Sequence, residues 1–139
     1  MRFVLLFILV FPLWAELPDY VIKNVKDIKE IVAGGGYIVK EVVHPKNDPV
    51  NSGFSIAYIK LPPGKSTKPH YLKSSSQVFY ILKGSAIFHI GSDVKRVSEG
   101  MAIYLAPGVI QWAENKGETE FEFICVVSPP WRADDEVVK

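Results

Sequence analysis

Short apolar runs with alternating polar positions recur along most of this chain, a pattern that predicts β-strands. Seven runs of four to eight residues, rich in Val, Ile, Phe and Tyr, have the length and composition of strands. Gly, Pro and Asn residues separate neighbouring runs and supply the turns between them. Short strands at nearly even spacing are typical of a β-sandwich or a small barrel, so we predict an all-β fold. The predicted strands cover residues 37–43, 54–61, 77–82, 85–90, 102–105, 110–113 and 120–127.

One segment, residues 25–32, has the spacing of a short amphipathic helical turn instead. Its apolar residues stand at positions 25, 28, 31 and 32, and Asn24 before them is a suitable N-cap. The glycines at 34–36 follow without a recognisable strand before them, and we interpret them as a flexible turn. The tail after Trp131 is polar, so we expect it on the surface, with Trp131 covering a barrel end or a partner surface.

Residues 1–15 differ from the rest of the chain. Met1 and Arg2 precede twelve uncharged residues, 3–14, and the small Ala15. A helix of that length spans only about 18 Å, whereas a bilayer core is about 30 Å thick, so we expect no stable membrane span. The pattern predicts a secretory signal peptide, cleaved after Ala15, that exports the protein to the periplasm or the extracellular space. Without that signal the protein would be cytoplasmic; the alternatives are an apolar first strand or an upstream segment without function.

The remaining residues, 16–139, suffice for one folded domain. Hydrophobic residues make up 48% of the whole chain and aromatic residues 12%, enough apolar surface to stabilise a core. The 16 Lys and Arg residues balance 15 Asp and Glu and are scattered singly, so we expect no nucleic-acid partner. The single cysteine, Cys125, cannot form a disulfide within the chain, and the apolar run 121–127 around it predicts a buried core position.

Chemistry-bearing residues occur in two sets with fixed spacing, and the first set begins at Gly64. Five residues separate Gly64 from His70, and one separates His70 from Leu72. Four residues then precede Gln77, and six more precede Gly84.

The second set begins at Gly100. Five residues separate it from the Ala-Pro-Gly sequence at 106–108, two more precede Gln111, and three more precede Asn115. Both sets resemble the two motifs of the cupin family, and the spacing matches at every step. The resemblance implies a cupin-type antiparallel β-barrel, also called a double-stranded β-helix or jelly roll, over residues 16–139, with a short N-terminal extension.

The same resemblance implies where a metal would bind. Cupins that hold a metal use the two His and the Glu of the first motif and the His of the second, and these positions carry His70, Leu72, Gln77 and Gln111 here. Leu72 has no donor atom, and a glutamine offers only a neutral amide oxygen. We therefore predict a degenerate metal site without a tightly held cofactor, in which His70, Gln77 and Gln111 bind a divalent transition metal only weakly.

Strand alternation places Gln77, Phe79 and Ile81 on the inner side of the barrel. Together with His70, Leu72 and Gln111 they would form a ligand pocket with polar groups and apolar walls, the composition of a small-molecule site. The alternative is a structural cluster in which His70, Gln77 and Gln111 satisfy one another, with the help of water.

Three further residues are predicted to lie outside this pocket. His44 precedes a proline at a strand end, which favours a surface or interface position. Alternation along residues 85–90 turns His89 away from the pocket, and alternation beside Gln111 turns Trp112 to the opposite face of its sheet.

Three functions fit this sequence. The first is a cupin that binds a small molecule without a tightly held metal, and the three substituted ligand positions favour it over an enzyme. The second is a metal-dependent oxygenase or isomerase with an unusual His–Gln–Gln site. The third is a non-catalytic accessory protein, a homodimer in which Phe54, Tyr58, Trp112 and the N-terminal strand pack against a second copy.

Overall fold

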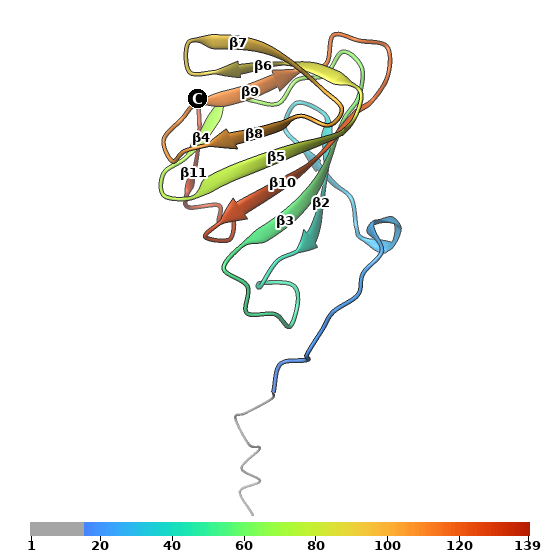
Figure 1. The fold of residues 1–139 in the computed structure, drawn as a ribbon, viewed down its shortest axis with the longest axis vertical. Coiled ribbons are helices and arrows are strands. Elements are labelled where there is room, and N and C mark those ends of the chain that lie inside the picture. The colour runs from blue at the N-terminus through green and yellow to red at the C-terminus, as the bar shows by residue number, and fades with distance from the viewer. Residues whose placement is uncertain (1–15) are drawn as a thin grey trace, which may run out of the picture.

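The computed structural model describes residues 16–139 and contains two antiparallel β-sheets packed face to face (Figure 1). The elements are η1 (Val25–Asp27), β1 (Ile31–Ala33), β2 (Tyr37–Val43), β3 (Ser55–Leu61), β4 (His70–Leu72), β5 (Ser76–Lys83), β6 (Ser85–Ile90), β7 (Asp93–Ser98), β8 (Ala102–Leu105), β9 (Gln111–Glu114), β10 (Phe121–Ser128) and β11 (Glu136–Val138). One sheet has the order β1-β2-β3-β10-β5-β8, and the other has the order β11-β4-β9-β6-β7. The predicted all-β fold is confirmed, whereas the predicted signal peptide, residues 1–15, lies outside the described residues.

Each of the seven predicted strands is present and ends within one residue of its expected bounds. The structure adds four strands that the apolar pattern did not predict. Three of them, β1, β4 and β11, have only three residues each, too few to show an alternation. The fourth, β7, pairs with β6 alone and is mostly exposed, so it carries polar residues on both faces.

The predicted helical turn over residues 25–32 is wrong beyond its first residues. Only Val25–Asp27 is helical, as one 3₁₀ turn, and Asn24 caps it by accepting a hydrogen bond from the Lys26 amide at 3.0 Å, as predicted. Ile31 and Val32 belong instead to β1, where β-branched residues are favoured and β2 supplies the hydrogen bonds. Within residues 16–139 there is no helix of the length and hydropathy that would cross a membrane.

The glycines at 34–36 connect β1 to β2 as the turn of a hairpin, so they do follow a strand. Gly35 has φ of +106°, and a Cβ atom added there would lie 2.3 Å from the carbonyl oxygen of Ser66. A glycine is therefore required where this hairpin contacts the loop before β4.

The tail lies on the surface only in part: residues 132–134 and 139 are exposed, as predicted, whereas Asp135 is buried and residues 136–138 form a strand. Glu136–Val138 forms β11 and pairs with β4, with Glu136 opposite Leu72 and Val138 opposite His70. Asp135 is 2% exposed and accepts hydrogen bonds from the Ser74 amide at 2.9 Å and from the Ser75 amide at 3.1 Å. These contacts join segments about sixty residues apart, so no local sequence pattern predicts them.

Apolar side chains from the inner faces of both sheets form the core. Phe79, Phe88, Phe121 and Phe123 pack with ring centroids 5.2 to 6.2 Å apart. Cys125 is 6% exposed, which confirms its predicted core position. Phe79, Phe88 and Phe123 also border a cavity that the core leaves open between the sheets.

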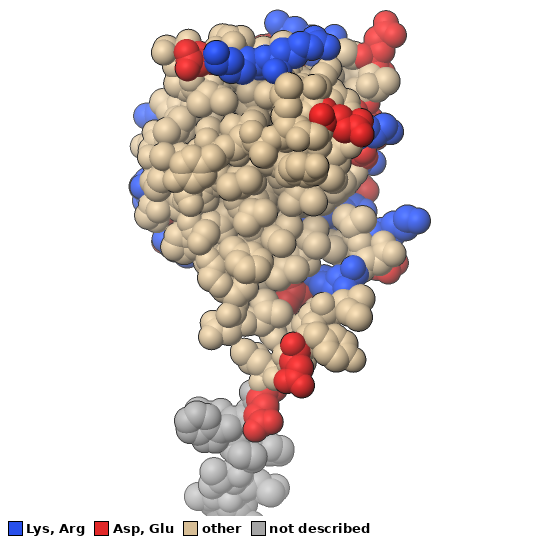
Figure 2. Space-filling model, viewed as in Figure 1, with Lys and Arg blue, Asp and Glu red and all other residues tan. Residues whose placement is uncertain are grey.

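The outer face of the six-stranded sheet is apolar. Val78, Tyr80 and Tyr104 are 39%, 48% and 67% exposed, and Val78 lies opposite Tyr104 across the β5–β8 ladder. Figure 2 shows the middle of this face as a broad area without Lys, Arg, Asp or Glu, with the charged side chains at its margins.

Candidate ligand-binding pocket

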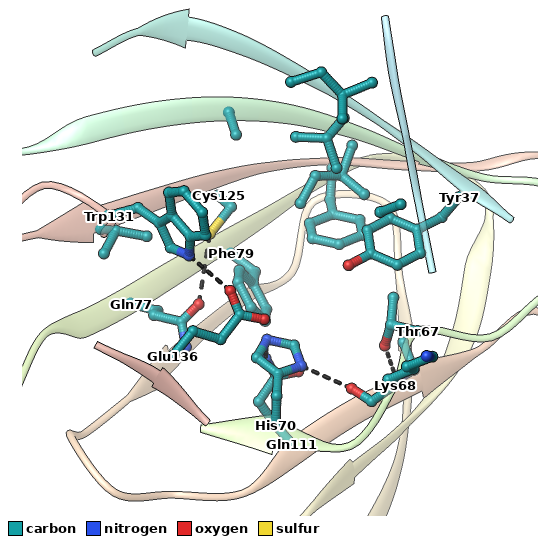
Figure 3. Close-up of a pocket in the computed structure, with 18 of the residues that line it drawn as sticks. Tyr37, Thr67, Lys68, His70, Gln77, Phe79, Gln111, Cys125, Trp131 and Glu136 are labelled. Atoms are coloured by element: carbon teal, nitrogen blue, oxygen red, sulfur yellow. Dashed lines mark hydrogen bonds between the residues drawn. The ribbon is translucent and has the colours of Figure 1, made fainter. Parts of the chain in front are cut away.

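The cavity between the two sheets has a volume of about 600 Å³. Residues of both sheets and of the tail line it (Figure 3). Its walls are mainly apolar, with polar side chains from β4, β5, β9 and β11. The apolar lining includes Ile31, Ala33, Tyr37, Val39, Ala57, Ile59, Phe79, Phe88, Phe123, Val127 and Val138.

His70 and Gln111 form a hydrogen-bonded pair in this cavity. They lie opposite each other on β4 and β9, and the Gln111 amide nitrogen is 2.9 Å from Nε2 of His70. Nδ1 of His70 is 2.7 Å from the carbonyl oxygen of Lys68. Because that oxygen can only accept, Nδ1 carries the proton, and in the neutral ring Nε2 accepts from Gln111. Both ring nitrogens are therefore engaged by this chain.

Gln77 is separate from that pair. It is 6% exposed on β5, and its Oε1 accepts a weak hydrogen bond from Sγ of Cys125 at 3.7 Å. Burial, with a smaller contribution from the charge of Glu136, raises the pKa of the Cys125 thiol to about 12. Cys125 thus stays protonated, donates to Gln77 and is a poor nucleophile.

Glu136 is a cavity residue that the sequence pattern did not reveal, and Trp131, which the sequence predicts to cover a barrel end or a partner surface, lines the same cavity. Nε1 of Trp131 donates to Oε2 of Glu136 at 2.8 Å, and Figure 3 shows Glu136 projecting between Trp131 and His70. Burial and the charge of Glu136 together raise the pKa of Tyr37, so its phenol stays neutral. Glu136 and Val138 share the inner face of β11, a two-residue periodicity that the brevity of the strand conceals.

Four of the six predicted pocket residues line this cavity: His70, Gln77, Phe79 and Gln111. The other two do not. Leu72 is 2% exposed and Ile81 is fully buried, and both belong to the packed core beside the cavity. Their strands follow the predicted alternation, but neighbouring side chains fill the space that these two residues face.

The predicted surface position of His44 is wrong. It is 7% exposed and borders the cavity, with Nε2 lying 2.8 Å from the carbonyl oxygen of Trp131. Nδ1 accepts from the Lys46 amide at 3.0 Å, so Nε2 holds the proton and donates it to the tail. The hydrogen-bond partner of His44 lies 87 residues away in the chain, which explains why the local sequence predicts a surface position.

His89 and Trp112 face away from the cavity, as predicted. Their rings stack with centroids 3.7 Å apart and planes 4° apart, and His89 Nε2 lies 2.8 Å from a carboxylate oxygen of Glu114. Trp112 is on β9 of the five-stranded sheet, whereas Tyr58 is on β3 of the six-stranded sheet. The structure therefore does not bring together the residues predicted to form one dimer interface.

Within residues 16–139, no group of three or more His, Cys, Asp and Glu side chains is arranged to hold a metal ion. The polar groups that line the cavity include two imidazoles, two amides, two hydroxyls, a thiol, a phenol, two carboxylates and an ammonium group. Such groups can orient a small molecule by hydrogen bonds and charge, while the apolar walls hold its body.

Two relatives are similar to this chain over most of their length. An uncharacterized protein from Methanocaldococcus jannaschii is 29% identical over 110 residues, which cover 78% of this chain and 86% of that protein. An oxalate-binding protein from Thermotoga maritima is 28% identical over 113 residues, which cover 81% of this chain and 88% of that protein.

Solved structures support the fold. A predicted oxalate decarboxylase from Thermotoga maritima superposes with a TM-score of 0.72 at 22% identity, covering 78% of this chain and 99% of that one. A Streptomyces PAC13 variant with uridine superposes with a TM-score of 0.68 at 15% identity, covering 84% and 88%. The family model described as a cupin domain matches residues 57–127, half of the chain, and this span contains both spaced residue sets. This chain belongs to the cupin family.

Proposed function

We propose that this protein binds a small organic molecule in the cavity between its sheets, without a tightly held metal ion and without catalysing a reaction. The observation that carries the proposal is the hydrogen bond from Gln111 to His70, which occupies the ring nitrogen that a metal or a proton transfer would need. A volume of about 600 Å³ and apolar walls with a few polar groups match the usual properties of small-molecule sites.

The donor atoms at the four family metal-ligand positions do not suit a divalent cation. Nδ1 of His70 holds the proton it donates to Lys68, and Nε2 accepts from Gln111. Leu72 has no donor, and the oxygen of Gln77 is turned to Cys125. A metal would have to break two of these hydrogen bonds, and the four positions offer no negative charge in return.

The same contacts favour binding over catalysis. A general base needs a free lone pair and a nucleophile needs a lowered pKa. His70 has both nitrogens engaged, and the raised pKa of Cys125 keeps its thiol protonated. A metal-dependent oxygenase or isomerase, the alternative function, would require a different arrangement of His70, Gln77 and Gln111.

The oxalate-binding relative suggests one candidate ligand, but the cavity supports a different one. Oxalate is a small dianion with no apolar part, whereas most of this cavity is lined by aliphatic and aromatic side chains. A larger molecule with an apolar body would bury far more surface here, at roughly 25 cal/mol per Å².

The test uses the uncharged fluorescent probe N-phenyl-1-naphthylamine. We expect the wild-type protein to bind this probe with enhanced fluorescence and with the same affinity after treatment with EDTA. Ala57→Phe should weaken binding at least tenfold, because Ala57 lines the cavity and a phenyl ring would fill it. Ala106→Phe is the matched control, since Ala106 is exposed in the turn after β8 and does not line the cavity.

Equal binding by the two phenylalanine variants would place the probe outside the cavity and contradict the proposal. Stoichiometric metal in the protein as purified, lost in His70→Ala, would contradict the metal-free part of it. In that case the metal-dependent enzyme would become the better explanation.

The apolar middle of the outer face of the six-stranded sheet supports a second, compatible role as a homodimer. Exposed apolar patches of this kind often mark protein interfaces. The middle of this face offers a charged partner nothing to pair with, but two copies related by a two-fold axis would cover each other's exposed Val78, Tyr80 and Tyr104. Trp112, which lies on the other sheet, is not part of this interface.

A further inference from the structure

Glu136 brings a carboxylate into the cavity without a cation to neutralise it. The side chain lies on β11, and one of its oxygens accepts from Nε1 of Trp131 at 2.8 Å. Within residues 16–139, Glu136 forms no ion pair, and no described residue donates a hydrogen bond to Oε1. The second oxygen is therefore available to a ligand.

The charge of Glu136 acts on other cavity groups. It contributes, after burial, to the raised pKa of Tyr37 and to the raised pKa of Cys125. These two residues come from β2 and β10, so the negative potential of the carboxylate extends across the cavity. A ligand held anywhere between them experiences this potential.

Aromatic residues line the same cavity as this carboxylate. Figure 3 shows Trp131, Phe79 and Tyr37 around the space that Glu136 enters. The face of an aromatic ring attracts a cation, by about 0.5–1 kcal/mol at exposed sites and about 2 kcal/mol where water is excluded. A cavity that combines a carboxylate with aromatic side chains is a favourable environment for an ammonium group.

The charged residues that line the cavity have a negative sum. They are Glu41 and Glu136 against one cation, Lys68, and Lys68 is exposed. An anionic ligand would place a second negative charge beside Glu136, and the two like charges would repel each other. A neutral ligand would cover Glu136 and leave its charge without a partner, which is also unfavourable. A cationic ligand removes both penalties.

We propose that the ligand of this pocket is an organic cation, a primary or secondary amine on an apolar or aromatic body. Its ammonium group donates to the free oxygen of Glu136, and its body lies against the apolar walls of the cavity. Glu136 is then the residue that determines charge specificity. This inference rests on the proposed small-molecule function and specifies its ligand class.

Three probes of nearly the same shape but different charge test this inference: 2-phenylethylamine, 2-phenylethanol and phenylacetate. Their dissociation constants are measured by calorimetry at pH 7 and low salt. We expect the amine to bind at least tenfold more tightly than the alcohol, and phenylacetate to bind most weakly.

Glu136→Gln should remove the preference for the amine, because it removes the charge that the amine neutralises and that the alcohol leaves without a partner. The variant keeps an oxygen that can accept from Trp131, and it leaves the Asp135 contacts of the tail intact, so we expect it to fold. Glu118→Gln, an exposed carboxylate outside the cavity, is the matched control and should keep the wild-type preference.

If the alcohol or phenylacetate binds as tightly as the amine, or if Glu136→Gln keeps the amine preference, the inference is overturned while a small-molecule site remains. If none of the three probes binds and N-phenyl-1-naphthylamine does not bind either, the proposed function fails together with it. If the naphthylamine probe binds but the phenylethyl series does not, the inference is again overturned and the proposed function stands.

Discussion

Asp135 holds the tail in place through charge-assisted hydrogen bonds. Its carboxylate accepts from the Ser74 amide at 2.9 Å and from the Ser74 hydroxyl at 2.5 Å, and also from the Ser75 amide at 3.1 Å. Burial acts to raise the pKa of Asp135, but the hydrogen bonds from Ser74 and Ser75 outweigh it, and the pKa lies below its usual value. The charged form of this one residue therefore fixes the segment that carries Trp131 and Glu136.

We predict that this interaction makes stability depend on acid pH. A carboxyl group with a lowered pKa stabilises the folded state above its unfolded pKa of about 3.9, and this contribution is lost as the pH falls through the folded pKa. Asp135→Asn should lower the free energy of unfolding at pH 7 by about 1.5–3 kcal/mol. It should also flatten the decrease in stability below about pH 4, as measured by urea unfolding across this range.

The neighbouring Asp134 provides the control, because its side chain is 79% exposed. Asp134→Asn should change stability by less than about 0.5 kcal/mol and should keep the wild-type pH dependence. The same acid profile in both variants would show that Asp135 does not anchor the tail.

At the scale of elements, the strands that could be predicted are those with enough residues to show a pattern. Apolar residues alternate or cluster over a full strand length in residues 37–43 and 120–127, and both segments form strands. The three-residue strands β1, β4 and β11 form because long partner strands or a pinned tail supply their hydrogen bonds. That information lies in the tertiary structure, and the helical spacing of residues 25–32 does not contain it.

The site shows the same division between local and long-range information. Motif spacing and strand alternation were enough to bring His70, Gln77, Phe79 and Gln111 to one cavity. Neither could place Glu136, because its position depends on Asp135 binding a loop some sixty residues earlier. Alternation gives the face of a sheet but not which part of that face stays open, and for this reason Leu72 and Ile81 lie in the packed core and not at the cavity.

The β1–β2 hairpin yields a prediction at this scale, because it carries Ile31, Ala33 and Tyr37 into the cavity wall. Gly35→Ala should destabilise the fold by about 2–4 kcal/mol, since the added Cβ would both strain a positive φ and collide with the Ser66 carbonyl oxygen. Gly64→Ala separates the two effects, because Gly64 also has a positive φ but open space around it, and should cost only about 1 kcal/mol. Equal midpoints of thermal unfolding for the two variants would contradict the steric part of this account.

At the scale of the whole molecule, the two sheets have different surroundings. Their inner faces enclose the core and the cavity, and the outer face of the six-stranded sheet leaves apolar side chains in contact with water. Tyr58 shares this face with Tyr80, opposite Ile124 on β10, and is hydrogen-bonded there to Glu122. The cavity and the proposed dimer surface thus lie on opposite sides of the same sheet.

We predict that the protein is a dimer in solution and that Tyr104→Lys makes it a monomer. The lysine would have to bury a charge against the partner's apolar face, a cost that should shift the equilibrium by at least tenfold, or about 1.4 kcal/mol. Light scattering after gel filtration measures the mass directly. Val94→Lys is the matched control, because Val94 is 59% exposed on β7 of the other sheet and should leave the dimer intact. A monomeric wild-type protein would rule out this interface.

The strands at the borders of both sheets have a consequence for how copies of this chain associate. Unpaired border strands can recruit further chains and lead to aggregates that grow without limit. Here β1 and β11 have three residues each and β8 has four, while β7 presents Asp93, Lys95 and Arg96 on an exposed edge. Short and charged borders are poor templates for strand addition. Self-association should therefore stop at a discrete assembly, and the protein should stay free of fibrils at high concentration.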